Sequence, residues 1–555
     1  MIEHVPILII ISPLTGALLL ELISRFESHE MMDEIITLTA LSVPVLLLIM
    51  FTPRALEEPI VYEMSGWERP FGISLVLDNL SIMMTGIVGI VTLSSFVYSL
   101  ESKNMLPQGE RYYFLFLFMT TGLYGVFLTG DLINRYVFFE MTVLTTYVLL
   151  TYTRTKESLR ASYYYLMIGS VASFLFLAGI ALIYFNVGLL DLKAIEETLP
   201  DTSIQTRIVI FSFFMVAIGV KSGLIPFHSW LPDAHVSAPT PMTAVLAGLT
   251  VKVGIYILLR ILKAGFQIEP ILNIVVIFGL VTGSIGSLMT FRYWNIKRIL
   301  TWHTIAQIGL ITACIGIWTP SSVSSALFHT VNHSIFKTLL FLSAGAFIFI
   351  YDAADIREIT LVKGHPLLAS TFLIGLLALL GIPPMNGFYS KAFIMRSALS
   401  RPYILVPLLI IQIITAASVF RIIYHASREK KYVETPVSIL KPLVILAGLV
   451  IFMGATTTIW MDNVIMPAGE VLVGGEAIQL QGYSEISTLM DPGGLLVLAT
   501  IPVGIILYIS SQKFGVPKPI SEIEVKRIVS EVSLTDAVRY ILVGQGVVIA
   551  LLLFY

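Results

Sequence analysis

Long, continuous runs of apolar residues constrain the fold of this chain more than any other feature. Residues 160–187 form one such run, and a helix needs only ~20 residues to cross the hydrocarbon core of a membrane. Strands of a spanning barrel would alternate apolar and polar residues, and these runs do not. A backbone in lipid must satisfy its own hydrogen bonds, so the runs predict an all-α, polytopic membrane protein.

Composition supports this interpretation. The chain has 555 residues, of which 56% are hydrophobic and 13% charged. Ordinary soluble domains are about 45–50% apolar and about 25% charged, so this chain has too little polar surface to fold in water. We predict roughly sixteen spanning segments of ~20 residues each. They are 5–23, 34–52, 74–100, 112–129, 132–152, 160–187, 207–235, 241–262, 271–290, 298–317, 322–350, 366–399, 403–427, 438–460, 493–511 and 537–555.

The distribution of charge between the loops predicts an orientation. Loops that follow odd-numbered spans are basic, and one of them holds Arg292, Lys297 and Arg298. Loops that follow even-numbered spans are acidic or neutral, and 461–492 contains no Lys or Arg. Because cytoplasmic loops are enriched in Lys and Arg, we expect the N-terminus outside the cell. The mixed charged and apolar stretch before the last span predicts a short surface helix on the cytoplasmic side.

Two parts of the chain share a layout. Residues 132–235 contain a charged helix, a long apolar helix and a helix interrupted at Pro226. Residues 291–399 repeat this order, with the interruption at Pro383 and Pro384. Proline-interrupted helices at matching positions of two halves are typical of transporters whose ion site lies at the midplane.

Glu140 and Lys221 are charges within such helices. A charge at the centre of a membrane helix costs ~2.5–3.5 kcal/mol on insertion scales, so a retained charge indicates function. Glu140 should lie ~13 Å deeper than Asp131 at 1.5 Å per residue, although it could also be an interfacial carboxylate. Lys221 precedes the break at Pro226, where freed carbonyls and water can hold an ammonium; the alternative is a snorkelling lysine.

A second group of charges lies further along the chain. Lys252 is well inside 241–262, too far from a loop to snorkel easily. His329, His333 and Lys337 are spaced i, i+4 and i+8, which places them on one stripe of a helix. Such a stripe could pass a proton, or it could be a polar seam between helices. A zinc pair is geometrically allowed at the histidines, but no third ligand is evident.

The remaining candidates lie near the two breaks. Lys391 follows Pro383 and Pro384 and is interpreted as the second-half counterpart of Lys221. His303 lies where the second half would place a partner of Glu140. His228 and His235, in the first broken segment, either hydrate or gate a channel or only satisfy freed backbone groups.

No residue pattern predicts a cofactor or a metal site. Cys314 is the only cysteine, which excludes a disulfide or a thiolate cluster within the chain. There is no glycine-rich nucleotide loop after a strand. Nothing indicates binding of nucleic acid.

Several of these segments resemble a known family. The stretch from Lys221 to His235, continuing through Ala238-Pro-Thr-Pro241, closely resembles the signature of the proton-translocating antiporter-like family. Asn332-His-Ser-Ile-Phe-Lys337 and Gly381-Ile-Pro-Pro384 match it as well. This family includes the large membrane subunits of respiratory complex I, the Mrp antiporters, and the membrane-bound hydrogenase and sulfane reductase complexes of archaea.

The resemblance implies fourteen core helices, two inverted five-helix repeats and a mid-membrane chain of charged residues. It implies six segments: N-terminal helices (1–111), a first repeat (112–262), a second repeat (271–427), C-terminal helices (428–511), a surface helix (512–536) and a final span (537–555). Glu140 and Lys221 resemble the family's Glu–Lys pair. Lys252 resembles the bridging group, and His333 and Lys337 resemble its extension. Lys391 resembles the terminal residue.

The resulting hypothesis is proton or sodium movement along this row, within a complex of several membrane subunits. Partner subunits would supply the energy by redox chemistry, so the chain would not be catalytic alone. The short surface helix favours a hydrogenase-, sulfane reductase- or Mrp-like assembly over the distal complex I subunit. Two alternatives remain: a stand-alone antiporter, and a structural subunit whose charges only hold helices together.

Overall fold

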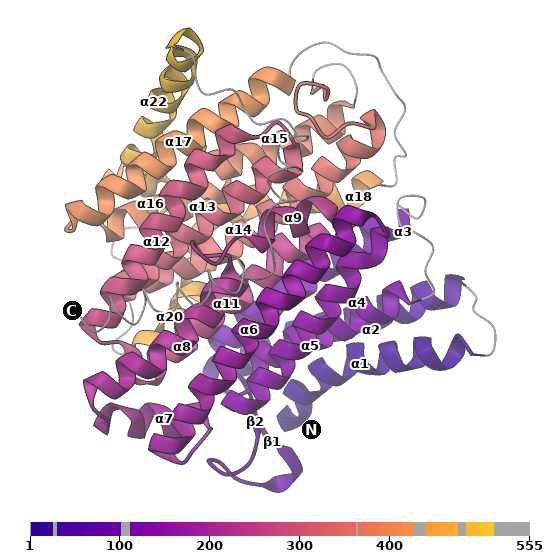
Figure 1. Cartoon of the computed structure of the whole chain (residues 1–555), viewed down its shortest axis with the longest axis vertical. Helices are drawn as coiled ribbons and strands as arrows, with labels where there is room; N and C mark the ends of the chain where they lie inside the picture. Colours follow the sequence, from indigo (N-terminus) through magenta and orange to yellow (C-terminus); the bar gives the residue numbers. More distant parts are fainter. Residues whose placement is uncertain are drawn as a thin grey trace.

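A computed structural model describes residues 2–25, 30–101, 111–361, 365–426, 439–474 and 484–514 of the chain. These residues are mostly helical, and Figure 1 shows the long helices packed side by side in one bundle. The N-terminal part contains α1 (Val5–Ile23), α2 (Glu30–Glu57), a hairpin of β1 (Ile60–Glu63) and β2 (Ser74–Leu77), and α3 (Asn79–Glu101).

The helices that follow are described in two groups, here called the first half and the second half. The first half consists of α4 (Tyr112–Leu128), α5 (Leu132–Leu150), α6 (Lys156–Val187), α7 (Leu192–Thr198), α8 (Ile204–Ser222), α9 (Trp230–Ser237), α10 (Thr240–Val245) and α11 (Val251–Ile261). The second half consists of α12 (Glu269–Met289), α13 (Ile296–Ile317), α14 (Pro320–Tyr351), α15 (Pro366–Leu380), α16 (Asn386–Ser397) and α17 (Pro402–Ala426). The chain continues with α18 (Leu440–Ala455), α19 (Thr457–Trp460), α20 (Met466–Val473), α21 (Glu485–Met490) and α22 (Pro492–Phe514).

The described residues confirm a polytopic helical membrane protein. Among them, 11 helices are long and apolar enough to cross a membrane, or up to 12 if the bent pair of Leu440–Ala455 and Thr457–Val473 is one span. The sequence predicted more spans, partly because some of its segments are short or interrupted helices. α22 continues to Phe514, past the expected start of the surface helix. The rest of that helix and the final span 537–555 lie outside the described residues.

Two expectations about loops and strands were wrong. The span expected from residue 74 begins as β2, whose Leu77 pairs with Ile60 of β1, because four residues of each strand satisfy their backbone groups against each other. The stretch 461–492, expected to be an acidic loop, is largely helical where it is described. In it α20 packs against α3 and α14, which buries its apolar side chains.

The two halves share local structures that fix their helices in the same way. α6 and α14 are each 32 residues long and begin with a capping box, formed by Thr155 and Ser158 in α6 and by Thr319 and Ser322 in α14. α5 and α13 each begin beside an antiparallel bridge, Asp131 to Asp191 and Asn295 to Asp355. These matched features follow the repeated layout seen in the sequence.

Each half also contains one interrupted helix. α8 ends at Gly223 and α15 ends at Gly381, and both glycines have left-handed backbone angles, with φ of +72° and +84°. Such angles end a helix without the penalty that a side chain would add. Pro226 and Pro384 follow each glycine at the same spacing, before α9 and α16 begin. The predicted breaks are therefore confirmed.

The β hairpin marks one end of the bundle, here called the hairpin face. His4 packs against Tyr62 of the hairpin, with ring centroids 5.3 Å apart, so the N-terminus lies at this face. Arg69 of the hairpin loop forms an ion pair with Asp191, which caps α7. Figure 1 shows the hairpin and α7 at the same end of the molecule.

Candidate functional site

The first charged pair lies between α5, α6 and α8. Lys221 is 3% exposed, and its ammonium donates a hydrogen bond to the Tyr165 hydroxyl at 3.3 Å. The same ammonium lies 5.0 Å from the centre of the Phe139 ring. Glu140, the residue next to Phe139, attracts Lys221 electrostatically, although no direct ion pair joins them among the described residues. Lys221 is thus buried and does not snorkel to a surface.

Glu140 itself is only partly buried. One of its carboxylate oxygens is enclosed without a close hydrogen-bond partner among the described residues, although the Ser173 hydroxyl interacts with the carboxyl group. The carboxyl group of Glu140 is therefore incompletely hydrogen-bonded. A purely structural carboxylate would be expected to be fully hydrogen-bonded when enclosed.

Lys252 lies at the centre of the bundle and is fully buried. Its ammonium donates to the carbonyl oxygen of Ala247, within a π-helical turn, Leu246–Thr250, that precedes α11. π-turns occur mostly as single insertions in helices and often at functional sites. Beyond this carbonyl, the described residues give the ammonium no other hydrogen-bond partner.

The stripe predicted on α14 is confirmed as a line of buried groups. His329 contacts the Ser390 hydroxyl through Nδ1 at 2.9 Å and the Gln307 side-chain oxygen through Nε2 at 3.0 Å. The ring of His333 lies 6.0 Å from that of His329, and neither of its nitrogens has a hydrogen-bond partner among the described residues. Lys337 donates to the carbonyl oxygen of Leu300 at 2.8 Å.

Lys391 lies just beyond the second break and is fully buried. Its ammonium donates to the carbonyl of Leu379, at the end of α15, and to Oε1 of Gln412 at 2.8 Å. Gln412 in turn donates to the carbonyl of Leu380 at 2.6 Å. The interrupted helix thus frees carbonyls that hold the ammonium, as a proline break is expected to do.

Lys221 and Lys391 do not occupy equivalent positions, contrary to the sequence interpretation. Lys221 precedes the first break, in α8, whereas Lys391 follows the second, in α16. His303 and Glu140, by contrast, lie at nearly matching positions, eight residues after the cap of α13 and nine after the cap of α5. The two halves share a backbone layout but carry these two lysines at different places on it.

The other histidines lie beside the row. His303 is buried and contacts the Ser418 hydroxyl at 3.1 Å, and His235 is buried and contacts the Thr301 hydroxyl at 3.1 Å. His228 is less enclosed, with its ring 5.2 Å from that of Trp302. His235 therefore has a hydroxyl partner, whereas Nδ1 of His228 has none among the described residues.

Several of these buried groups influence one another electrostatically and are here called the cluster. His333 interacts with Lys252, Lys337 and Lys391, and Lys337 interacts with Lys252 and Lys391. The cluster thus joins the end of the first half to the break in the second half. Glu140 and Lys221 form a separate pair, and no direct hydrogen bond connects them to Lys252 among the described residues.

Sequence reasoning missed a buried lysine at the edge of this cluster. Lys297, expected in a basic loop, is 7% exposed in the first turn of α13 and donates to the carbonyl of Ala238 at 3.2 Å. It also interacts electrostatically with His235. It was missed because neighbouring Arg292 and Arg298 made the segment look like a solvated loop.

The polar partners of the row were missed as well. Gln307, Ser390 and Gln412 are uncharged residues in apolar runs, and only their contacts with His329 and Lys391 distinguish them. Gln307 and Gln412 could have been found from the sequence, because an unpaired amide in the middle of a membrane helix is costly in lipid.

Interrupted helices together with buried lysines and histidines define a class of membrane subunits that translocate ions. The chain belongs to the NADH:quinone oxidoreductase/Mrp antiporter family, whose transmembrane profile matches residues 129–419.

Individual relatives agree with this family. The chain is 35% identical, over 71% of its length and 82% of the relative, to a Na(+)/H(+) antiporter subunit of Alkalihalophilus pseudofirmus. It is 32% identical, over 85% of its length and 96% of the relative, to a Staphylococcus aureus protein designated antiporter subunit mnhD2.

Solved structures share the fold. A chain of an archaeal membrane-bound sulfane sulfur reductase superposes with a TM-score of 0.79 at 26% identity, covering 85% of this chain and 98% of that one. A chain of the Mrp complex from Dietzia sp. DQ12-45-1b superposes with a TM-score of 0.77 at 22% identity, covering 90% and 99%.

Proposed function

We propose that this chain is an antiporter-like subunit of a multi-subunit membrane complex and moves protons, sodium ions or both along its buried charged groups. The observation that carries this proposal is the cluster of Lys252, His333, Lys337 and Lys391, which lies in the centre of the bundle. Such a concentration of cationic and titratable groups is costly in a membrane and has no purpose in a purely structural subunit.

The path begins at Glu140 and Lys221 and ends at Lys391. A proton on Lys221 is stabilised by Glu140, and a change in that pairing would release the proton toward Lys252. Repulsion among Lys252, Lys337 and Lys391 would then favour release of a proton at the second break. His303, His228 and His235 line the route as supporting groups.

The two breaks would provide access from opposite sides of the membrane. Pro226 opens the first half, comprising residues 112–262, and Pro383 and Pro384 open the second, comprising residues 271–427. Irregular backbone at membrane depth is tolerated where it lines a polar cavity. We also propose that the hairpin face lies outside the cell, with the N-terminus. The helices that begin at this face have the basic segments at their other ends, and basic segments favour the cytoplasmic side.

The partners are other membrane subunits. The antiporter relatives are designated as subunits, and both matched structures belong to complexes. Energy would come either from an ion gradient or from redox chemistry in those partners. A stand-alone antiporter is the less supported alternative.

Purification from native membranes followed by a vesicle transport assay tests this function. We expect the chain to co-purify with several membrane subunits. Vesicles that contain this complex should change their luminal pH when a sodium gradient is imposed, or when an electron donor is supplied. Purified chain that transports ions alone at the rate of the complex would contradict the proposed assembly. An intact complex that moves neither ion would contradict the proposed function.

A further inference from the structure

A second polar stripe leads from Lys252 toward the hairpin face. Lys252, Tyr256 and Arg260 are spaced i, i+4 and i+8 on α11, so they lie on one side of that helix. Arg260 is near the end of the helix, with its side chain 12% exposed. An ion at Lys252 would therefore meet Tyr256 and Arg260 if it moved in this direction.

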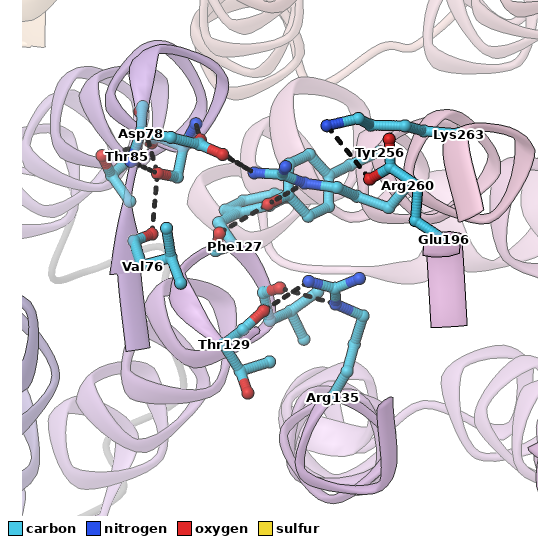
Figure 2. A network of polar contacts seen from close by, with 12 residues as sticks. Val76, Asp78, Thr85, Phe127, Thr129, Arg135, Glu196, Tyr256, Arg260 and Lys263 are labelled. Carbon is cyan, nitrogen blue, oxygen red and sulfur yellow. Dashed lines mark hydrogen bonds and ion pairs between the residues drawn. The ribbon is translucent and has the colours of Figure 1, made fainter. Parts of the chain in front are cut away.

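Two guanidinium groups lie close to the ring of Tyr256. The Arg260 guanidinium lies 5.1 Å from the ring centre, and that of Arg135, which comes from α5, lies 5.4 Å from it. Figure 2 shows Arg260 reaching toward Asp78, while Arg135 points toward the carbonyl of Thr129. Arginine keeps its proton in proteins, so both groups present permanent positive charge.

The hydrogen bonds at Tyr256 end a possible proton wire. Its hydroxyl donates to the carbonyl oxygen of Phe127 at 2.6 Å and accepts from Nε of Arg260 at 2.9 Å. A carbonyl has no proton to pass on, and an arginine does not release one. A proton that reached this hydroxyl would have no onward acceptor that could in turn donate.

The two arginines differ in how they are neutralised. Arg260 donates to both carboxylate oxygens of Asp78, at 2.8 and 2.7 Å. Arg135 is 1% exposed and donates to the carbonyls of Val126, at 3.3 Å, and Thr129. It forms no ion pair among the described residues, and its Nη1 has no hydrogen-bond partner there.

A purely structural role explains only part of this arrangement. The pair of Asp78 and Arg260 ties the start of α3 to α11 and would hold the hairpin in place. Arg135 does not contribute to that tie. Asp131 and Asp78 attract Arg135 electrostatically, but neither forms an ion pair with it among the described residues, so a salt bridge does not explain its burial.

We propose that Arg135 and Arg260, which both lie beside Tyr256, form an electrostatic seal that stops cations from leaking between Lys252 and the hairpin face. A fixed positive charge in a narrow polar route excludes protons and metal cations while the rest of the route remains polar. The seal rests on the proposed ion row, because only a row that holds ions at Lys252 requires closure at this end. It would force ions to leave through the breaks.

A passive leak assay tests the seal without requiring transport to be active. Assembled complex, isolated by gel filtration and placed in vesicles, is given a pH gradient with valinomycin and potassium to balance charge, and no energy source. We expect the gradient of the Arg135→Gln complex to decay at least about tenfold faster than that of the wild type, since a buried positive charge that no ion pair holds is removed. Arg260→Gln, which leaves Asp78 next to Arg135, should leak as well.

Three comparisons make the result specific. Arg135→Lys keeps the charge and should hold the gradient as the wild type does. Lys263→Gln removes a cation that pairs with Glu196 at 3.3 Å near the surface, and it should not leak. Adding Lys252→Met to Arg135→Gln should close the leak, because the ions would lose their route.

The seal is refuted if assembled Arg135→Gln and Arg260→Gln complexes both hold the gradient as long as the wild type. Equal leakage by Arg135→Lys would show that packing, not charge, closes this end. A leak that persists with Lys252→Met would place the route elsewhere. The leak is measured with no energy source, so active transport does not contribute to it. A negative result here is therefore distinct from failure of the proposed function.

Discussion

Complexes that carry Lys391→Ala should assemble but should no longer transport ions. Lys391 is the last cation of the row, and its ammonium is held by the Leu379 carbonyl and by Gln412. Alanine leaves these acceptors without a proton donor and leaves the second break without a charge. We expect transport to fall by at least ~100-fold, the lower end of the effect of a positioned proton-transfer group.

A matched pair of variants separates lost charge from lost structure. Lys391→Gln can still donate to Gln412 or to Leu379, but it cannot carry a proton, so it should be as inactive as Lys391→Ala. Lys156→Ala removes an exposed lysine in the first turn of α6 and should transport normally. Transport by Lys391→Gln at the wild-type rate would remove Lys391 from the path.

The second large effect is expected for Lys221→Met. This change keeps the length and apolar stem of the side chain and removes only the ammonium. Its one hydrogen bond among the described residues, to Tyr165, is long at 3.3 Å. Assembly should therefore be retained. Vesicle transport should fall by ~100-fold or more, because the proton donor at the start of the row is lost.

Tyr165→Phe is the control for this prediction. It removes the hydrogen-bond partner of Lys221 but keeps the charge and the ring, so we expect a loss of less than about tenfold, as for one modest hydrogen bond. Glu140→Gln should also reduce transport, because Lys221 loses the charge that stabilises its protonated form. If Tyr165→Phe is as inactive as Lys221→Met, packing at this site matters more than the charge.

Much of the site could be predicted from the sequence because charge is rare in a membrane helix. Lys252 and Lys337 stand in apolar runs that leave them no route to a surface, and the structure places both in the buried interior. The breaks were predictable for a similar reason, since proline removes a backbone donor and glycine tolerates the angles that end a helix. The roles of these residues stay proposals.

The partners of the buried side chains could not be predicted from the sequence, because they depend on contacts between distant segments. Gln412 is 21 residues from Lys391, and nothing local shows that they meet. Arg135 follows Asp131 by four residues, and nothing local shows that its guanidinium lies beside Tyr256 of α11. The hairpin strands are only four residues long, and their pairing is supported by Thr129, which bridges to Leu75.

The most direct test of the ion row is transport by complexes that carry Lys252→Met. Lys252 is buried near the end of the first half and donates to the carbonyl of Ala247, and methionine removes its charge with little change in volume. If ions pass along the row, the complex should assemble in wild-type amounts, and vesicles that contain it should show no change in luminal pH above background, with or without sodium. Transport by an equally assembled Lys252→Met complex at the wild-type rate would show that ions do not pass through the centre of this chain.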